Sequence, residues 1–191
     1  GIIDVVATAS PGIDDIVVLG KIKQLERSDA YDLVVVDGPA AGHAITFLLA
    51  AQSLLASVRG GPIHSQATEV LAMLTDPTRC QVVLVTLPET TPVNEAVETA
   101  YALEERVGVH LGPVVVNSVD MGPALDADAA LEGSPMRLAA EFRNARRALH
   151  RRECDRLADE LALPQLHLPS VAGSHLTIES IAALADHWAP A

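Results

Sequence analysis

A carboxylate and a glycine lie close together after the first strongly apolar run of the chain. The run at residues 33–36 ends at Asp37, and Gly42 follows where a helical segment begins. A carboxylate that closes a buried strand can hold Mg²⁺ through water, and a glycine N–H can approach a terminal phosphate because no Cβ interferes. The pair indicates chemistry on a magnesium-bound phosphate. A strand-ending aspartate with an ordinary Gly-Pro turn explains the same residues without a ligand, and the pattern alone leaves both interpretations open.

The elements that would position these residues begin with valine-rich runs. Runs at 33–36, 82–85, 114–116 and 165–168 are apolar without alternating with polar residues. Strands that are apolar on both faces are typical of a parallel sheet covered by helices. We therefore expect an α/β fold, with a doubly wound and mostly parallel sheet flanked by helices. Ligands of such sheets bind at the carboxyl ends of the strands, where Asp37 lies.

Helices are expected between these runs. Ser10-Pro11 and Thr91-Pro92 each combine a helix-capping side chain with a proline suited to the first turn. The predicted helices lie at about 10–27, from 91 onward, at about 136–161 and at about 177–187. In the third of these, one stripe of apolar side chains is expected to face the core. Its members are Leu138, Phe142, Ala145 and Leu149.

Composition excludes several classes of protein. The 191 residues suit one domain, and the formal net charge of −12 argues against a nucleic-acid binder, which needs a basic surface. Cys80 and Cys154 belong to no Cys-x-x-Cys pair, so we expect no zinc. The uncharged stretch at 38–58 opens with Gly-Pro and holds polar side chains, which favours a buried helix over a membrane span. We expect a cytoplasmic protein without an integral membrane segment.

The sequence at 37–48, DGPAAGHAITFL, resembles switch II of the ArsA-like P-loop ATPases. These are the arsenite-pump and tail-anchored-protein targeting ATPases, which are related to MinD and ParA and share an Asp-x-Ala-Pro-x-Gly-His pattern. The residues that fit are Asp37, Pro39, Gly42, His43 and the pair Phe47-Leu48. The proline comes one residue earlier than in some members. Weaker similarities occur in the same order as in the family, at 10–15 before this segment and at 86–89, 94–95, 115–117 and 169–171 after it.

The resemblance implies part of a P-loop NTPase fold and a site for ATP and Mg²⁺. Asp37 would position the metal through water, and Gly42 would sense the γ-phosphate; these are the two expected catalytic residues. Pro39 would shape the loop. His43 would sense phosphate or couple the site to a partner, although it could equally donate a hydrogen bond to a backbone carbonyl. The base would be held by Asn117, which could also be a plain turn-former, and by Pro169, Ser170 and Val171.

The phosphate-binding loop of that family has no counterpart in these residues. No G-x-x-x-x-G-K-[ST] sequence occurs, and the only lysines are Lys21 and Lys23. We therefore expect residues 1–191 to form a single α/β domain, the carboxyl-terminal part of a larger ATPase domain. The chain by itself is then expected to be inactive. A relative that has truly lost the loop and hydrolysis is the alternative.

Two functions of different classes follow. The first is an ATPase that couples MgATP binding and hydrolysis to a partner or an unknown client protein. The second is a non-catalytic interaction subunit that pairs with an active ATPase. Either would form a homodimer or a heterodimer with a related subunit. The arginine-rich segment at 137–156 is either a solvated helix face or a docking surface for an acidic partner.

Overall fold

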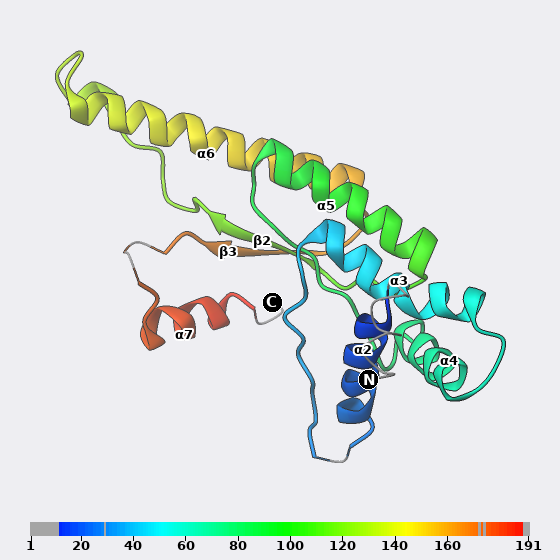
Figure 1. Cartoon of the computed structure of the whole chain (residues 1–191). Coiled ribbons are helices and arrows are strands. Elements are labelled where there is room, and N and C mark those ends of the chain that lie inside the picture. Colours follow the sequence, from blue (N-terminus) through cyan, green and yellow to red (C-terminus); the bar gives the residue numbers. More distant parts are fainter. Residues whose placement is uncertain (1–11, 29, 172, 174, 189–191) are drawn as a thin grey trace. The chain divides into compact units, whose positions relative to one another are not determined.

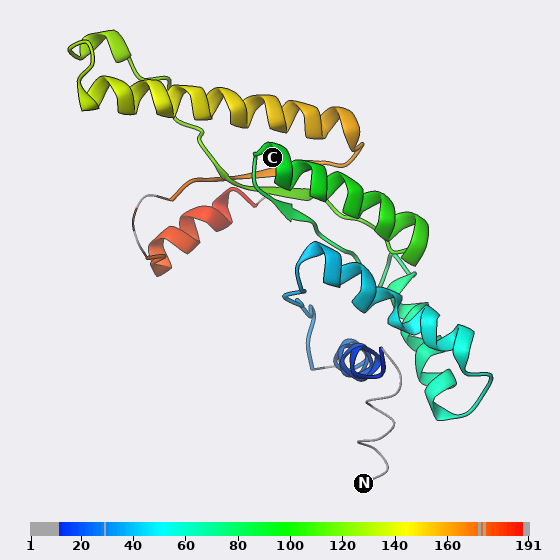
Figure 2. The same cartoon turned by 45° about the horizontal axis from the view of Figure 1, so that its top comes forward.

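The structure is a computed structural model of the chain, and it describes residues 12–28, 30–171, 173 and 175–188 (Figures 1 and 2). Its contacts divide the chain into two compact units, and each is described by itself. Unit 1 comprises residues 1–82 and 98–111, and unit 2 comprises 83–97 and 112–191. The expectation of a single domain over 1–191 stays a prediction. The expected helix start at Ser10-Pro11 lies outside the described residues.

Unit 1 is built from helices. α2 (Ile13–Glu26), α3 (Ala41–Ser57) and α4 (Pro62–Leu74) pack pairwise on one another, and α3 also contacts the π-helix η1 (Leu103–Val107). The small and branched side chains at this junction are completely buried and let the helices approach closely; they include Ala51, Ala67 and Val70. The start of α4 follows from its sequence, because Gly61 adopts a positive φ of 88° and a proline occupies the first turn.

Ion pairs connect α2 to the later parts of unit 1. Arg79 donates two hydrogen bonds to the carboxylate of Glu26, at 2.9 and 2.8 Å. The ammonium of Lys23 lies 2.9 Å from a carboxylate oxygen of Glu69 on α4. These hydrogen bonds favour the ionised forms, so the pKa of Glu26 and that of Glu69 lie below their ordinary value. The Lys23–Glu69 pair therefore links α2 to α4, and the Arg79–Glu26 pair links α2 to the segment after α4, while the helix contacts supply the burial.

The predicted strand at 33–36 is wrong. The segment is extended chain outside any sheet, and its side chains are largely exposed, with 77% for Leu33 and 83% for Val35. A valine-rich run becomes a strand only where a neighbouring strand accepts and donates its backbone hydrogen bonds. Within the described part of the chain, no strand pairs with residues 33–36.

Unit 2 contains a parallel sheet of three strands in the order β1-β2-β3. The strands are β1 (Val85–Thr86), β2 (Val114–Val119) and β3 (Gln165–Pro169), with Val85 opposite Val115 and Val116 opposite His167. Residues 114–116 are buried, as expected for a central strand covered on both faces. The α/β class with a parallel sheet and flanking helices is confirmed. Of the predicted strand at 82–85, only Val85 belongs to a strand, β1, and Val82 forms only an isolated bridge to Leu111.

Helices account for the rest of unit 2. α5 (Thr90–Ala102) follows β1, with residues 98–102 counted in unit 1, and the 3₁₀-helix η2 (Ala127–Ala129) precedes α6 (Pro135–Glu160). α6 connects β2 to β3 and begins where the Ser134 hydroxyl accepts the N–H of Arg137, with proline at the first position. α7 (Ile178–Asp186) begins with a capping box made by Thr177 and Ser180.

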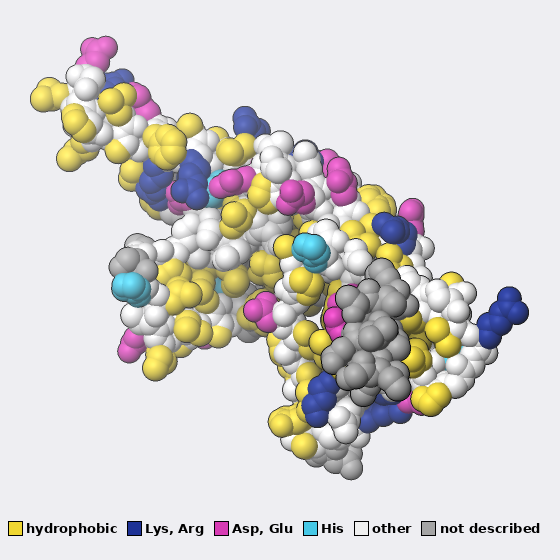
Figure 3. Space-filling view, in the orientation of Figure 1, with side chains coloured by type: hydrophobic (Ala, Val, Ile, Leu, Met, Phe, Trp, Pro, Cys, Tyr) yellow, Lys and Arg dark blue, Asp and Glu magenta, His cyan; other side chains and the backbone are white. Residues whose placement is uncertain are grey.

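The predicted inward stripe of α6 is also wrong. Leu138 and Phe142 are exposed to 57% and 71%, whereas His150, Cys154 and Leu157 are buried. Both sets repeat at helical spacing, so periodicity could not separate them. The amino-terminal part of α6 extends past the ends of β2 and β3, and hydrophobic side chains show on its surface there (Figures 1 and 3). Only the carboxyl-terminal half has a sheet to pack against.

This difference between the two stripes predicts a large loss of stability from truncation in one stripe and almost none in the other. Leu157→Ala should lower the free energy of unfolding by about 2–5 kcal/mol, because it leaves a cavity under α6. Leu138→Ala on the same helix should change it by less than about 0.5 kcal/mol, because that side chain already lies in solvent. Urea unfolding followed by circular dichroism measures both. A larger loss for Leu138→Ala would show that the stripe predicted from the sequence is the buried one.

Candidate functional site

The first group of predicted site residues lies in unit 1, at the entrance to α3. Asp37 and Pro39 are exposed in the extended segment that leads into the helix, and Gly42 and His43 lie in its first turn, also exposed. The segment enters α3 through Ala40, whose φ and ψ of −57° and 153° are those of extended backbone. The structure therefore places these four residues of the switch II-like motif along one short stretch of chain.

Among the described residues, no group satisfies the free amides at the start of α3. Ala40 offers no capping side chain, and the first turn contains no acidic residue. The N–H of His43 donates to the carbonyl of Ala40 at 2.9 Å, but the N–H groups of Ala41 and Gly42 have no acceptor among the described residues. Uncapped amides and the positive end of the helix dipole together attract an anion.

The space beside this turn is open. A Cβ built on Gly42 would meet no atom within 4 Å, so the fold itself does not demand glycine there. A ligand approaching the amide closely would supply such a demand. The imidazole of His43 makes no hydrogen bond within the described part of the chain, so the carbonyl contact expected as an alternative role is not seen.

The second group lies in unit 2, where β2 and β3 end. The side-chain oxygen of Asn117 accepts the N–H of Ser118 at 2.9 Å, and Ser118 has a positive φ of 58°. Ser170 donates its N–H to the carbonyl of Val119 at 3.0 Å and its hydroxyl to the carbonyl of Ser118 at 2.7 Å. These bonds hold the last residues of β2 against the segment after β3. The structure thus brings Asn117 together with the segment at 169–171.

The two groups belong to different units. Asp37, Pro39, Gly42 and His43 lie in unit 1, and Asn117, Pro169, Ser170 and Val171 lie in unit 2. Their joint action on one ligand stays a prediction.

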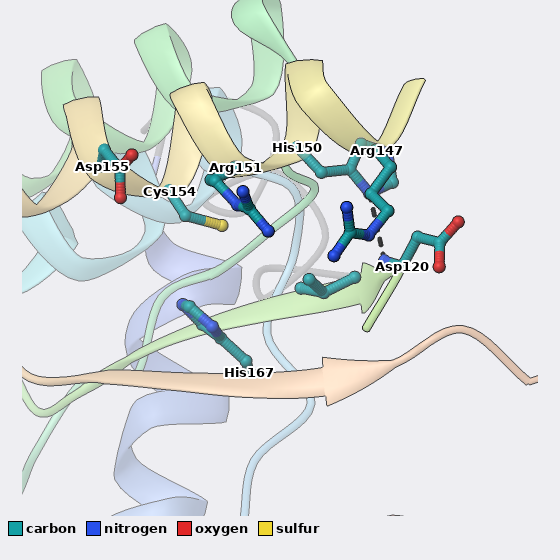
Figure 4. A pocket seen from close by; sticks show the side chains of 8 residues that line it. Asp120, Arg147, His150, Arg151, Cys154, Asp155 and His167 are labelled. Atoms are coloured by element: carbon teal, nitrogen blue, oxygen red, sulfur yellow. Dashed lines mark hydrogen bonds between the residues drawn. The ribbon is translucent and has the colours of Figure 1, made fainter. Parts of the chain in front are cut away.

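Sequence reasoning missed a third cluster, which lines a cavity of about 230 Å³ in unit 2. α6 forms one wall, and the end of β2 and the middle of β3 form the other (Figure 4). The lining residues are Val119, Asp120, Arg147, His150, Arg151, Cys154, Asp155 and His167. The available signal was the spacing of 147, 150, 151 and 154, because residues three and four apart share one helix face.

Charge in this cluster is partly compensated. Arg143 donates to both carboxylate oxygens of Asp120, at 2.9 and 3.0 Å, and this holds the pKa of Asp120 below its ordinary value. The Nδ1 atom of His150 lies 3.2 Å from the backbone nitrogen of Asp120. Burial, together with the charge of nearby Arg146, lowers the pKa of His150, so its ring is neutral at neutral pH.

The arginine-rich segment of α6 is partly used within the chain. Arg137 pairs with Asp128 and Glu141, and Arg156 pairs with Glu153 and Glu160. Together with the pair between Arg143 and Asp120, these contacts neutralise part of the positive charge that the sequence offered to an acidic partner. The remaining arginines lie toward the middle of the helix.

No cluster of three or more histidine, cysteine or acidic side chains that could hold a metal ion occurs among the residues that the structure describes. A magnesium ion bound through water needs only one carboxylate from this chain, and exposed Asp37 fits that requirement. Across the described ranges, none of the helices combines the length and the apolar character needed to cross a bilayer.

Comparison with known proteins agrees with the motif at Asp37. The family model described as anion-transporting ATPase matches residues 1–59. ATPase BagA of Mycobacterium tuberculosis is 30% identical over 204 residues, which cover 90% of this chain and 59% of that protein. An arsenical pump-driving ATPase of Escherichia coli is 35% identical over 112 residues, 57% of this chain and 19% of that protein. A putative arsenical pump-driving ATPase of Halobacterium salinarum is 29% identical over 116 residues.

The chain thus spans 59% of the length of its mycobacterial relative and a smaller share of the pump-driving ATPases. The similarity to BagA runs through both units, and the family model covers the Asp37 segment and all of α3. The family model and these relatives together support an ArsA-like P-loop ATPase family for this chain.

Proposed function

We propose that the whole protein binds and hydrolyses MgATP, and that this chain supplies the switch II part of its nucleotide site. The observation that carries the proposal is the uncapped start of α3 directly after Asp37. It combines a carboxylate suited to a hydrated metal with free amides suited to a phosphate, inside the region that the family model matches.

Each residue of this segment has a distinct role in the proposal. The Asp37 carboxylate accepts hydrogen bonds from water bound to Mg²⁺, which when present neutralises charge on the phosphate oxygens. The N–H of Gly42 donates to the terminal phosphate, and the absence of a Cβ lets that oxygen come close. Pro39 restricts φ ahead of the helix and so limits the conformations of the loop. His43, exposed in the first turn, reports the state of the phosphate to a partner.

The ends of β2 and β3 hold the base in this proposal. The amide nitrogen of Asn117 makes no hydrogen bond with other described residues, so it can donate to a ring nitrogen of adenine. Ser170 fixes the neighbouring segment through its two bonds to the last residues of β2. Pro169 and Val171 then offer apolar surface to one face of the base.

Coupling to a partner follows from the same geometry. Exposed chain leads from residue 31 to Asp37 and on to α3, with few contacts to hold it in place. Loss of the terminal phosphate would release the amides of α3 and let this segment move, as switch segments of nucleotide hydrolases do. We propose that this movement acts on a client protein or on a second ATPase subunit, and that it takes place in the cytoplasm, where MgATP is available.

The role of Asp37 is tested by substitution in the whole protein. Asp37→Asn should lower the hydrolysis rate by about 100-fold or more, because the metal loses a charged oxygen partner. Asp32→Asn is the matched control, since it removes an equally exposed carboxylate from the same segment and should leave the rate unchanged. Phosphate release at saturating MgATP measures both rates. Hydrolysis at the parent rate in Asp37→Asn would overturn the assignment, and absence of hydrolysis in the parent would favour the non-catalytic subunit.

Gly42 allows a test in which stability and activity move in opposite directions. Gly42→Ala places a methyl group in open space and removes a helix-destabilising glycine, so stability should rise by about 0.5–1 kcal/mol. Hydrolysis should fall by at least about tenfold, because that methyl group lies where the phosphate oxygen must approach. Gly60→Ala, where a Cβ would also meet nothing within 4 Å, controls for the substitution itself. Unchanged hydrolysis in Gly42→Ala would remove Gly42 from the site.

A further inference from the structure

The cavity under α6 has the size of a small polar ligand. Its volume of about 230 Å³ lies below the range typical of drug-sized sites but exceeds the space of several water molecules. Arg147 and Arg151 stand one helical turn apart on the wall that α6 provides. In Figure 4 both guanidinium groups extend from α6 toward the strands, and the ring of His167 extends from β3 toward them.

Both arginines of the cavity lack a partner in the part of the chain that the structure describes. Neither Arg147 nor Arg151 forms a hydrogen bond or an ion pair with another described residue. The Nε atom of Arg147 is buried and has no acceptor. Buried donors are nearly always satisfied in folded proteins, because the loss of hydration is otherwise uncompensated. The Nε atom of Arg147 therefore faces a cavity in which no described residue supplies the acceptor that this donor needs.

The acidic side chains of the cavity do not supply that acceptor. The Asp120 carboxylate is held by Arg143 through two hydrogen bonds. Asp155 is exposed and stands beyond Cys154, at the opposite end of the row from Arg147 (Figure 4). Burial raises the pKa of Cys154, so this side chain remains a neutral thiol at neutral pH and adds no negative charge. The middle of the cavity keeps an excess of positive charge.

His167 contributes an acceptor rather than another donor. The amide nitrogen of Gln165 donates to the carbonyl of Cys154 at 3.0 Å, which leaves its oxygen, Oε1, to face Nε2 of His167 at 2.8 Å. Nε2 must then carry the proton. Burial lowers the pKa of His167, so the ring is neutral and Nδ1 holds a lone pair. No described residue donates to that lone pair.

We propose that this cavity binds hydrogen phosphate. Its oxygens would satisfy the guanidinium groups of Arg147 and Arg151, which suit the bidentate recognition of phosphate. Its remaining hydroxyl would donate to Nδ1 of His167. Inorganic phosphate keeps a proton at neutral pH, whereas sulfate has the same shape but no proton to donate. The site thus differs from the proposed nucleotide site in its residues and selects a protonated oxyanion.

Calorimetric titration of the whole protein with phosphate at pH 7 and constant ionic strength tests the proposal. The titrations use the Gly42→Ala background, in which the added methyl group blocks phosphate from the amides at the start of α3, so that only the cavity under α6 is measured. Phosphate should bind, and Arg147→Gln or Arg151→Gln should each weaken binding by about tenfold or more, since each removes charge-assisted hydrogen bonds. Arg152→Gln is the control on the same helix, because Arg152 is exposed and does not line the cavity, and it should change nothing.

Sulfate supplies the second arm. Sulfate should bind at least about tenfold more weakly than phosphate, because it leaves the lone pair of His167 without a donor. His167→Phe should bring the two affinities close together. Absence of phosphate binding, equal binding of sulfate in the parent, or an equal loss in Arg152→Gln would overturn the proposal.

Thermal melts separate this role from a structural one. Without phosphate, Arg147→Gln should melt at or above the temperature of its parent, because it removes a buried donor that has no partner. With phosphate, the parent should melt at a higher temperature and the variant should not, since only a ligand that binds the folded state stabilises it. A lower melting temperature of the variant without phosphate would show that Arg147 serves the fold instead.

Discussion

The need of backbone groups for hydrogen-bond partners decides most of this structure. β2 pairs with β1 on one side and β3 on the other, and its buried valines form the centre of unit 2. The segment at 33–36 has the same composition but pairs with no described strand, and its side chains remain exposed. The same requirement appears at the start of α3, where amides that no capping group satisfies follow Asp37 directly. The proposed function places a phosphate at those amides.

The sequence predicted helices and strands correctly where residues close together in the chain determine them. The capping serine and proline ahead of α6 and the buried valines of β2 were readable from the sequence. The inward face of α6 was not, because Leu138 and Leu157 both fit a helical repeat and only the extent of the sheet distinguishes them. Of the candidate site, the sequence located Asp37 and Gly42 through a motif, while the contact between Ser118, next to Asn117, and Ser170 after β3 required the parallel register.

The arginines of α6 show why composition is a poor guide to charge. The sequence presents them as one basic face, but Arg137, Arg143 and Arg156 are engaged by carboxylates of the same unit. Arg147 and Arg151 are left facing a cavity that also contains a histidine from β3. The spacing of 147, 150, 151 and 154 places these residues on one helix face, but the helix sequence does not show that β2 and β3 close a cavity against that face. The positive charge that is available to a ligand is therefore the charge of those arginines that the fold leaves unpaired.

Hydrogen–deuterium exchange of the whole protein, with and without MgATP, tests most directly whether the start of α3 binds the nucleotide. The account predicts slower exchange of the amides at 41–43 when MgATP is added, and recovery of fast exchange when Mg²⁺ is chelated. Slower exchange elsewhere in the protein, with residues 41–43 unchanged, would contradict it.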